Sequence, residues 1–507
     1  MDPRLLRYYN QELRYLRELG GEFAREFPKI AARLGMDGVE VADPYVERLL
    51  EGCAFLAARV QLKQDAEFPR FSQRLLELVY ANFLAPTPAM LVAQITPVPD
   101  PNLLKGQVLP RDSSLQGPAS NHSSTRCEFR TAQAVRLTPL SVLSADYFLN
   151  VSDLGLSSLA LPTRPRCGVR IRLQLPPGMS MAQLELDELR FYLGGQTDVA
   201  MRLHELLLSS TVAVLAGPPG SLARPELRRA LPGSAVQPVG YAEEESLLPT
   251  ALRGFAGTRI LQEYFAFPER FLFLDIAGLR PALQACPGNE IELVLLLSRQ
   301  GSGLDGVVDA SNFALHCTPA INLFPKRADR IQIDEGHHEF HVLPDRTAPL
   351  DYEVYDVQGL HGYDDHGSEH HFLPLYAPDH AVKPGQPAYY TAWREPRLPS
   401  ERSRREGPRS GYIGSEVFVS LVDTSEAPYP GSLRQLSVQT RCTNRDLPVF
   451  LSSGGLTEFS LNSGVPVQSV RAVAGPSRPH TALREGGVAW RFINLLSLNY
   501  LSLLDTE

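Results

Sequence analysis

Apolar residues in the first 85 positions recur every three or four residues, which is the period of a helix that packs along another helix. The spacing predicts a first helix that reaches about residue 34, with Gly20, Gly21 and Pro28 as places where it bends or divides. The apolar positions that share one seam of this helix are Tyr9, Leu13, Leu16, Gly20, Phe23, Phe27, Ile30 and Leu34. The seam packs either on neighbouring N-terminal helices or on a partner chain, and both interpretations stay open.

Other apolar side chains of the first helix lie off that seam. They are Leu5, Leu6, Tyr8, Tyr15 and Leu19. A single packed helix would not cover both groups, which favours a role in assembly. The candidate partner contacts on this helix are Tyr9, Leu13, Leu16, Phe23 and Phe27.

Two more helices are expected before residue 88. Asp43 fits the N-cap of the second helix and Pro44 fits its first position, where a missing N–H removes no hydrogen bond. Its apolar seam comprises Val46, Leu50, Cys53, Ala57 and Val60. A third helix is predicted to begin near Pro69 and to end at Ala85–Pro88.

After Pro88 the apolar pattern changes to alternation with a period of two, which indicates strands. The alternating segments are Met90–Thr96, Val169–Leu175, Glu188–Leu193, Glu290–Ser298, Ile331–Ile333, Glu339–Leu343, Tyr352–Val357, Val417–Val422 and Gln435–Thr440. Two short helices are expected among them, at Asp198–Leu207 and Leu261–Pro268. The predicted fold class is α+β, with a helical N-terminal region followed by several mainly antiparallel β domains.

The pattern divides the chain into four regions. Residues 1–88 form a helical assembly region, and residues 89–330 form a first β-rich, wing-like region with a short inserted helix. Residues 331–480 form a second β-rich region with a His-rich loop and an Arg-rich loop, and residues 481–507 begin a C-terminal assembly region.

Two stretches are expected to be loops or linkers. Pro218–Val239 is rich in Pro, Gly, Ala and Ser, and Glu395–Ser410 holds five arginines and three prolines. The Arg-rich loop is either simply solvated or a docking site for an acidic partner surface. Its candidate interface residues are Arg402, Arg404 and Arg405.

Composition narrows the functional classes. The formal net charge of -8 and the pI near 5.9 give no overall electrostatic footprint for nucleic acid. The six cysteines include no CxxC pair, so neither a disulfide framework nor a zinc ribbon is indicated. The charged N-terminus does not resemble a signal peptide, and no apolar run is long enough to span a bilayer. A cytosolic protein without membrane insertion is expected.

The sequence gives only weak signals for a catalytic or cofactor-binding site. Gly301–Gly306 matches GxGxxG after an apolar strand, but neither a helix start nor a carboxylate about 20 positions on follows it, so a glycine-rich turn is expected. The chain has no nucleophile elbow, phosphate-binding loop or cysteine nucleophile motif. Neither an enzyme nor a bound cofactor is predicted. A hydrolase with an unrecognised site would require a deep polar pocket with perturbed titratable groups.

Histidines suggest an alternative function. Eight of the 12 lie between His337 and His380. His337, Glu339 and His341 alternate and would share one face of a strand, as ligands of a transition metal would. The segment is interpreted either as a polar surface loop or as part of a metal- or carbohydrate-binding β module.

Longer motifs resemble a known family. At the N-terminus these are Leu6–Arg17 (LRYYNQELRYLR), Phe23–Leu34 (FAREFPKIAARL), Ala42–Gly52 (ADPYVERLLEG), Ala66–Phe71 (AEFPRF) and Leu84–Pro88 (LAPTP). Further along they are Leu261–Phe271 (LQEYFAFPERF), Pro319–Phe324 (PAINLF), Val342–Arg346 (VLPDR), Asp351–Tyr355 (DYEVY), Tyr412–Phe418 (YIGSEVF) and Leu495–Asn499 (LLSLN). Together they resemble the TssF family of bacterial type VI secretion baseplates, nearly from end to end.

The resemblance implies a structural wedge subunit. In this family two TssF copies embrace one TssG, which carries TssK, and the wedges surround the VgrG spike as a platform for tube and sheath. TssE is a further implied partner. The implied location is the cytoplasm, at the inner face of the inner membrane, where the baseplate docks on the membrane complex. Family members usually continue past the position that matches Leu504, so residues 481–507 are expected to be only the start of a C-terminal assembly region.

Overall fold

The computed structural model describes residues 3–37, 40–41, 43–120, 123–250, 256–334, 336–375, 388–398, 405, 407–423, 429, 431–451, 458–462, 464–483 and 486–501. The chain divides into two compact units. The helical unit comprises Met1–Leu84 together with Leu483–Glu507, and the β-rich unit comprises Ala85–Ala482. Both ends of the chain therefore belong to the same unit.

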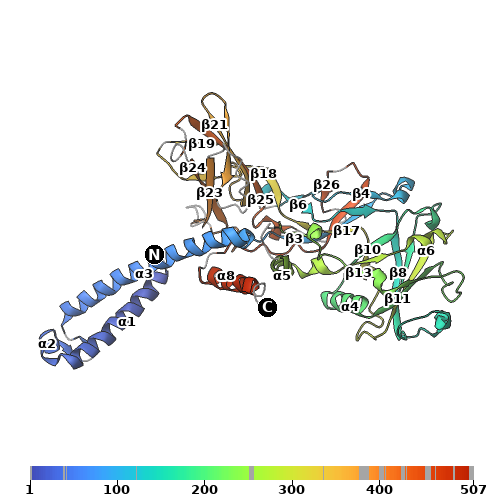
Figure 1. Ribbon diagram of the computed structural model, residues 1–507, viewed down its shortest axis with the longest axis horizontal. Helices are drawn as coiled ribbons and strands as arrows, with labels where there is room; N and C mark the ends of the chain where they lie inside the picture. Colours follow the sequence, from blue (N-terminus) through green and yellow to red (C-terminus); the bar gives the residue numbers. More distant parts are fainter. Residues whose placement is uncertain are drawn as a thin grey trace. The chain divides into compact units, whose positions relative to one another are not determined.

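The helical unit is built on a hairpin of two helices, α1 (Pro3–Glu26) and α3 (Pro44–Tyr80) (Figure 1). The short helix α2 (Pro28–Arg33) and the strand pair β1 (Met36–Asp37) and β2 (Glu40–Val41) connect them. The expected division near Pro28 is confirmed, because α1 ends at Glu26 and Pro28 opens α2. Gly20 and Gly21 lie inside α1 without interrupting it.

α3 is one continuous helix of 37 residues, so the prediction of a separate helix near Pro69 is wrong. A proline inside a helix removes a backbone hydrogen bond and costs about 3 kcal/mol. That local cost is offset by tertiary packing, because α3 packs on α1 and on α8 (Gly486–Leu501). The predicted start is confirmed: Asp43 accepts a hydrogen bond from the Tyr45 N–H, and Pro44 is the first helical residue.

The helix α8 covers the end of α3 with aromatic contacts. Phe492 stacks on Phe83 with ring centroids 3.9 Å apart and lies 6.0 Å from the Tyr80 ring. Tyr80 is 2% exposed. The helical unit is therefore completed by a segment about 400 residues further along the chain.

The β-rich unit begins with a six-stranded sheet of order β26-β5-β6-β17-β3-β27. Its strands are β3 (Met90–Pro97), β5 (Ser114–Ser120), β6 (Ser123–Thr131), β17 (Cys317–Ile321), β26 (Ser460–Leu461) and β27 (Val467–Ala474). β4 (Gln107–Leu109) and β7 (Val135–Leu137) form a small ladder beside it. Buried side chains such as Leu91, Ile95 and Phe129 form its core.

A five-stranded and a four-stranded sheet share the largest core, which includes Ile171, Phe191, Leu203, Phe273 and Leu293. The five-stranded order is β12-β11-β15-β9-β8, formed by β8 (Ser141–Phe148), β9 (Cys167–Gln174), β11 (Thr211–Gly217), β12 (Arg229–Pro232) and β15 (Glu290–Leu297). The four-stranded order is β13-β14-β10-β16, formed by β10 (Glu188–Leu193), β13 (Val236–Pro238), β14 (Phe273–Ala277) and β16 (Phe313–Ala314).

Three helices accompany these sheets: α4 (Thr197–Ser210), α5 (Ala256–Ala266) and α6 (Arg280–Gln284). α4 and α5 confirm the two short helices predicted from the sequence. The interpretation of Pro218–Val239 as a linker is wrong in part, because β12 and β13 lie within it. Both are edge strands of four residues or fewer, too short to show an alternating pattern.

An eight-stranded sheet has the order β18-β25-β21-β22-β23-β24-β20, with β19 also paired to β25. Its strands are β18 (Phe324–Arg327), β19 (Ile331–Gln332), β20 (Phe340–Val342), β21 (Glu353–Asp364), β22 (Glu369–Pro374), β23 (Ala388–Pro396), β24 (Ser415–Asp423) and β25 (Leu433–Thr443). Only β22 and β23 pair in parallel among its described strands. The predicted α+β class with mainly antiparallel sheets is confirmed. No helix within the described ranges combines the length and apolar character needed to cross a bilayer.

Candidate assembly interface

The predicted seam of α1 divides into a covered and an uncovered part. Tyr9, Leu13 and Leu16 are half-buried in the hairpin. Phe23 and Phe27 are 37% and 48% exposed, and their ring centroids lie 5.3 Å apart. Only the last two of these five candidate residues are therefore exposed enough to contact another molecule with a large part of their side chain.

α1 also exposes apolar residues that lie off the predicted seam. Tyr15 and Leu19 are more than half exposed and, with Phe23, follow one another at intervals of four residues. Residues at this spacing lie on one face of a helix. We call Tyr15, Leu19 and Phe23 the α1 stripe.

α3 carries a buried and an exposed stripe. Ala54 and Ala58 are completely buried one turn apart, and such small side chains permit close approach of a neighbouring helix. The predicted seam was displaced by one position, because Cys53 and Val60 are exposed instead. Alanine is apolar whether it lies on the buried or the exposed face of α3, so the apolar period alone could not show which face is buried.

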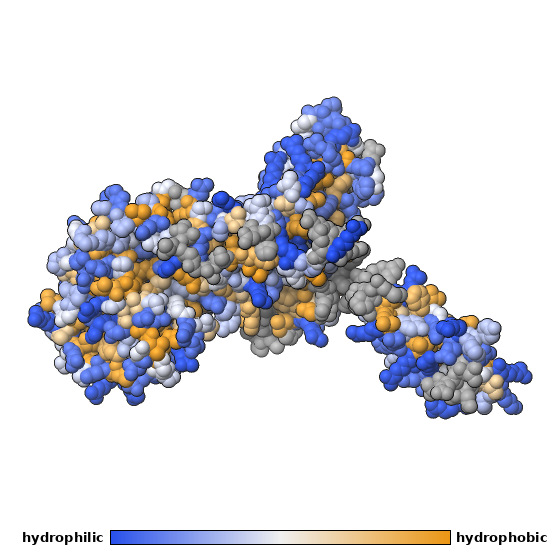
Figure 2. Space-filling model, turned by 180° about the vertical axis from the view of Figure 1, so that it is seen from behind, coloured by the Kyte–Doolittle hydropathy of each residue, from blue (hydrophilic) through white to orange (hydrophobic). Residues whose placement is uncertain are grey.

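The exposed residues of α3 form a second helical stripe. Tyr45, Leu49, Leu56 and Val60 follow at intervals of four, seven and four residues and are between 58% and 85% exposed. We call these four residues the α3 stripe. Figure 2 shows one face of the hairpin, where hydrophobic residues lie among hydrophilic ones. Burial of one such side chain contributes about 1.5–3 kcal/mol, so a partner that covered both stripes would bind through a substantial apolar contact.

Part of the Arg-rich loop, residues 399–404 and 406, lies outside the described residues. Arg402 and Arg404 are not among them, and Arg405 is exposed. The loop ends are fixed by arginines that the sequence did not single out. Arg397 donates to the Pro349 carbonyl at 2.6 Å, and Arg409 lies in a larger polar cluster.

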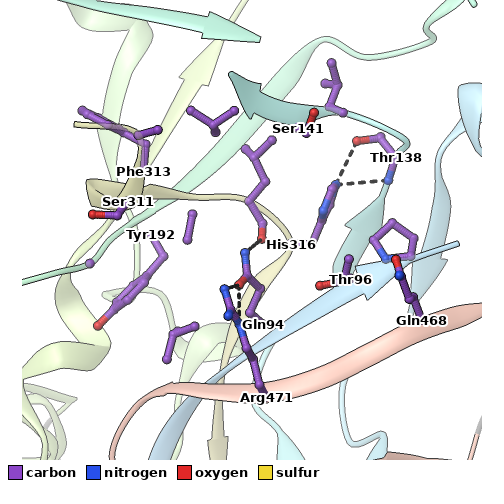
Figure 3. A pocket seen from close by; sticks show the side chains of 18 of the residues that line it. Gln94, Thr96, Thr138, Ser141, Tyr192, Ser311, Phe313, His316, Gln468 and Arg471 are labelled. Carbon is purple, nitrogen blue, oxygen red and sulfur yellow. Dashed lines mark hydrogen bonds between the residues drawn. The ribbon is translucent and has the colours of Figure 1, made fainter. Parts of the chain in front are cut away.

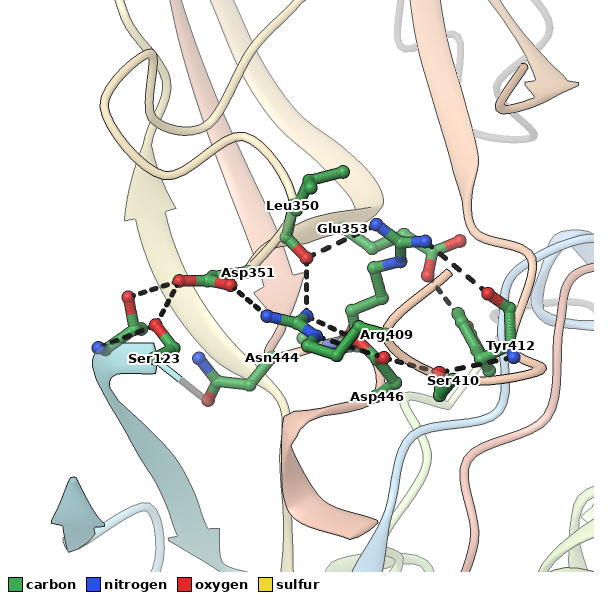
Figure 4. Close-up of polar contacts among 12 residues, drawn as sticks. Ser123, Leu350, Asp351, Glu353, Arg409, Ser410, Tyr412, Asn444 and Asp446 are labelled. Atoms are coloured by element: carbon green, nitrogen blue, oxygen red, sulfur yellow. Dashed lines mark hydrogen bonds and ion pairs between the residues drawn. The ribbon is translucent and has the colours of Figure 1, made fainter. Parts of the chain in front are cut away.

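The Arg409 cluster joins the six-stranded and eight-stranded sheets (Figure 4). Arg409 contacts Asp351 and Asp446, each at 2.6 Å. Asp351 also accepts hydrogen bonds from Ser123 and Thr125 on β6 at 2.5 and 2.8 Å. Burial favours the neutral form of both carboxyl groups, but the hydrogen bonds outweigh it and hold the pKa of Asp351 and of Asp446 below the ordinary value.

A cleft of about 650 Å³ in the β-rich unit tests the hydrolase alternative (Figure 3). Its histidine, His316, is directed at Thr138, whose N–H donates to Nε2 at 3.3 Å. Burial lowers the pKa of His316 to about 4, so the ring is neutral at pH 7. The hydroxyls of Ser141 and Ser311 donate to the Gln174 carbonyl and to Asp309. Among the lining residues that the structure describes, no serine contacts the imidazole, and the hydroxyl that does is that of Thr138, whose Oγ1 lies 3.0 Å from Nε2.

A family model decides the identity. The model "Type VI secretion system, TssF" matches residues 1–507, the full length of the sequence. The chain belongs to the TssF family. The resemblance seen in the sequence motifs is thereby confirmed.

Similar TssF proteins and structures agree with that assignment. The chain is 48% identical to "Type VI secretion system component TssF1" of Pseudomonas aeruginosa, over all of this chain and 81% of that protein. Its fold matches a chain in the cryo-electron microscopy structure of the type VI secretion system TssK-TssF-TssG baseplate subcomplex, with a TM-score of 0.66 and 24% identity. That match covers 90% of this chain and 79% of the other, and it shows that the two share a fold.

The TssF motif Leu261–Phe271 encloses charged residues that sequence reasoning missed. Glu263 and Arg270 are completely buried and contact each other, and Arg259 is 3% exposed. Glu263 accepts from the Leu247 and Leu248 N–H groups at 3.1 and 2.9 Å. The signal was present in the sequence, because charges inside an aromatic run at intervals of four and seven residues indicate paired burial.

The same TssF motif exposes an aromatic edge. Phe265 is 81% exposed and Tyr264 is 47% exposed, with their rings 5.7 Å apart. The adjoining Phe267 and Phe271 are buried. α5 therefore presents an exposed apolar surface on the β-rich unit, in addition to the stripes of the helical unit.

The histidines of this TssF chain do not lie on one strand face. β20 begins at Phe340, so the prediction that His337, Glu339 and His341 share a strand is wrong. His337 precedes it: its N–H donates to the Asp334 carbonyl, and its ring contacts the Asp334 carboxylate at 3.1 Å. His361 lies opposite His371 on β21 and β22. Within the described ranges, no group of three or more His, Cys, Asp or Glu side chains is placed to hold a metal ion.

Proposed function

We propose that this chain is a structural wedge subunit of the type VI secretion baseplate and acts by assembly rather than catalysis. Membership of the TssF family carries the proposal. The fold shared with a chain of a TssK-TssF-TssG subcomplex supports it. So do the α1 and α3 stripes, which leave seven large side chains partly or largely uncovered.

The proposed partners follow the family resemblance. Two copies of this chain pair with one TssG, and TssK, TssE, the VgrG spike, sheath and tube proteins complete the particle. The proposed location is the cytoplasm at the inner membrane. In this proposal the α1 and α3 stripes contact TssG or the second copy, and Tyr9, Leu13 and Leu16 support the stripes from within the hairpin. Arg402, Arg404 and Arg405 remain proposed contacts for an acidic surface.

The test is co-expression of this chain with TssG from the same gene cluster, followed by mass determination of the purified complex. A two-to-one complex is expected. A Leu49→Asp, Leu56→Asp variant should fold but fail to assemble, because both side chains are exposed in the chain itself. A Leu143→Asp variant, changed at an exposed position of β8, is the matched control and should assemble normally. A chain that stayed monomeric beside TssG would contradict the proposal.

A further inference from the structure

The strongest unassigned feature is a cleft of about 760 Å³ in the β-rich unit. We call it the Arg327 cleft. It is lined by the segment that leads into β5, by β6, by the loop before α5, and by β18, β21 and β25. Its size falls in the range of specific binding sites. Because several separate elements form its walls, the cleft is a product of the folded unit and not of one loop.

The lining is rich in positive charge although the chain as a whole is acidic. The cations that line it are Arg111, Arg130, Lys326, Arg327 and Arg441, and the carboxylate among the lining residues is Asp112. Three of the cations have carboxylate partners outside the cleft: Arg130 with Glu128, Lys326 with Asp345, and Arg441 with Asp356. These ion pairs orient the side chains and reduce their charge, so the positive surplus lies on the other two.

Arg111 and Arg327 have only neutral partners among the described residues. Arg111 donates to the carbonyls of Glu244 and Ser246 at 2.8 and 2.9 Å, which fixes its guanidinium. Arg327 uses Nε to donate to Ser437 Oγ at 3.0 Å. Its two terminal nitrogens make no hydrogen bond to another residue that the structure describes, so the fork that suits a carboxylate is open.

The surroundings of Arg327 favour side-chain recognition over strand addition. β18 is the edge strand of its sheet, and Arg327 lies opposite Gln439 with Arg441 two residues further along β25. Pro325 has no backbone N–H to donate at that edge, and a strand of four residues offers few backbone hydrogen-bond partners. An incoming segment would therefore be held mainly by arginine and amide side chains.

We propose that the Arg327 cleft binds an acidic segment of a protein partner, with an Asp or Glu side chain on the Arg327 guanidinium. Charge complementarity identifies the occupant: two arginines lack a carboxylate, and glutamines 358 and 439 supply neutral hydrogen-bonding groups beside them. The inference concerns the β-rich unit alone. It is independent of the proposal that the α1 and α3 stripes mediate assembly, and either proposal can fail without the other.

Binding can be measured by fluorescence anisotropy with the full chain. The probe is a labelled peptide of alternating glutamate and glycine, and its control has glutamine in place of glutamate. The acidic peptide should bind saturably and lose affinity with added salt. Arg327→Gln should weaken it about tenfold or more, as expected for loss of a charge-assisted hydrogen bond. Arg111→Gln should also weaken it.

The matched control is Arg330→Gln, because Arg330 is exposed three residues away but does not line the cleft. It should bind the peptide as the unaltered chain does, and Arg327→Gln and Arg330→Gln should both unfold at the temperature of the unaltered chain. Absence of saturable binding, equal binding of the glutamine peptide, or equal binding by Arg327→Gln would each overturn the proposal. Tighter binding of an oligothymidylate than of the acidic peptide would overturn it in favour of a phosphate-backbone ligand.

Discussion

Glu263 and Arg270 lie completely inside the β-rich unit, so each charge depends on its neighbours for compensation. Glu263 also receives two backbone N–H groups, and Arg270 donates to the carbonyls of Gly240 and Glu245. The cluster therefore fixes the loop between residues 240 and 248. A change in either residue affects local structure as well as charge.

Glu263→Gln should lower the free energy of unfolding of the β-rich unit by about 3–5 kcal/mol, because it leaves the charge of Arg270 buried without its partner. Denaturant unfolding followed by circular dichroism would measure this change. Glu205→Gln is the control, since Glu205 pairs with Arg299 on the surface and should contribute less than about 1 kcal/mol. Equal effects of the two substitutions would contradict the conclusion that Glu263 compensates the buried charge of Arg270.

The Arg409 cluster gives the protein a defined sensitivity to acid. The pKa values of Asp351 and Asp446 are lower in the folded chain than the ordinary value near 3.9, so the unfolded chain binds more protons as the pH falls. Their contribution to stability is complete above about pH 5 and is lost as the pH falls through the ordinary value towards the folded pKa.

Urea unfolding between pH 7 and pH 3 should therefore show a smaller loss of stability in Asp351→Asn than in the unaltered chain. The variant starts from a lower stability at pH 7, because Arg409 and two hydroxyls have lost an ionised acceptor. Parallel pH curves for the two proteins would show that Asp351 does not titrate in this way.

For single residues, the sequence predicts the chemical character of a side chain better than its solvent exposure. It marks Tyr9, Leu13 and Phe27 as apolar, but burial depends on where α3 lies, which a residue pattern does not contain. Arg409 was part of a recognisable Arg-rich loop, yet its partners Asp351 and Asp446 are more than 35 residues away. Contacts of that range come only from the fold.

Among the elements, α3 depends on small residues for its packing. Ala54 and Ala58 are completely buried, whereas Leu49 on the same helix is 69% exposed. The side of α3 that meets the hairpin interior is therefore the alanine side. In this part of the helix the larger side chains of the α3 stripe face outward, the reverse of an ordinary amphipathic surface helix, whereas Leu76 and Tyr80 nearer its end are buried.

Ala58→Leu should destabilise the helical unit by about 1–3 kcal/mol, because three added carbon atoms have no space in the hairpin. Leu49→Ala should change stability by less than about 0.5 kcal/mol, since its side chain is already in water. Thermal unfolding of the two variants, followed at 222 nm, would measure the difference. A larger loss in Leu49→Ala would mean that the packed face has been misidentified.

The elements themselves were well predicted where the pattern was long. The first helix, the start of α3 at Pro44 and strands such as Glu188–Leu193 and Glu290–Leu297 occur where periodicity placed them. β12 and β13 were missed because edge strands of three or four residues carry no measurable period. The continuity of α3 through Pro69 was missed because the sequence shows the energetic cost of a proline inside a helix. It does not show the contacts with α1 and α8 that offset this cost.

For the whole molecule, the division into two units is the main constraint. The chain has two tryptophans, and each unit contains one: Trp490 in the helical unit and Trp393 in the β-rich unit. A variant that keeps only one tryptophan therefore reports on the unfolding of one unit. This arrangement separates effects that a whole-chain signal would mix.

Phe492→Ala should destabilise the helical unit by about 2 kcal/mol, because the ring is half-buried and stacks on Phe83. Fluorescence of Trp490, in a Trp393→Phe background, should show the loss. Fluorescence of Trp393, in a Trp490→Phe background, should show the β-rich unit unfolding at its original denaturant concentration. Equal shifts of both signals would indicate that the two units unfold as one.

The assembly of the helical unit from both ends of the chain has a consequence for protein synthesis. Tyr80 and Phe83 leave the ribosome early, but their cover, Phe492, follows only after about 400 residues of the β-rich unit have been made. At about 5–20 residues per second this delay is roughly 20–80 s. A nascent chain therefore cannot complete its helical unit before translation reaches α8, and an interrupted translation product carries an uncovered aromatic site that chaperones and proteases can recognise.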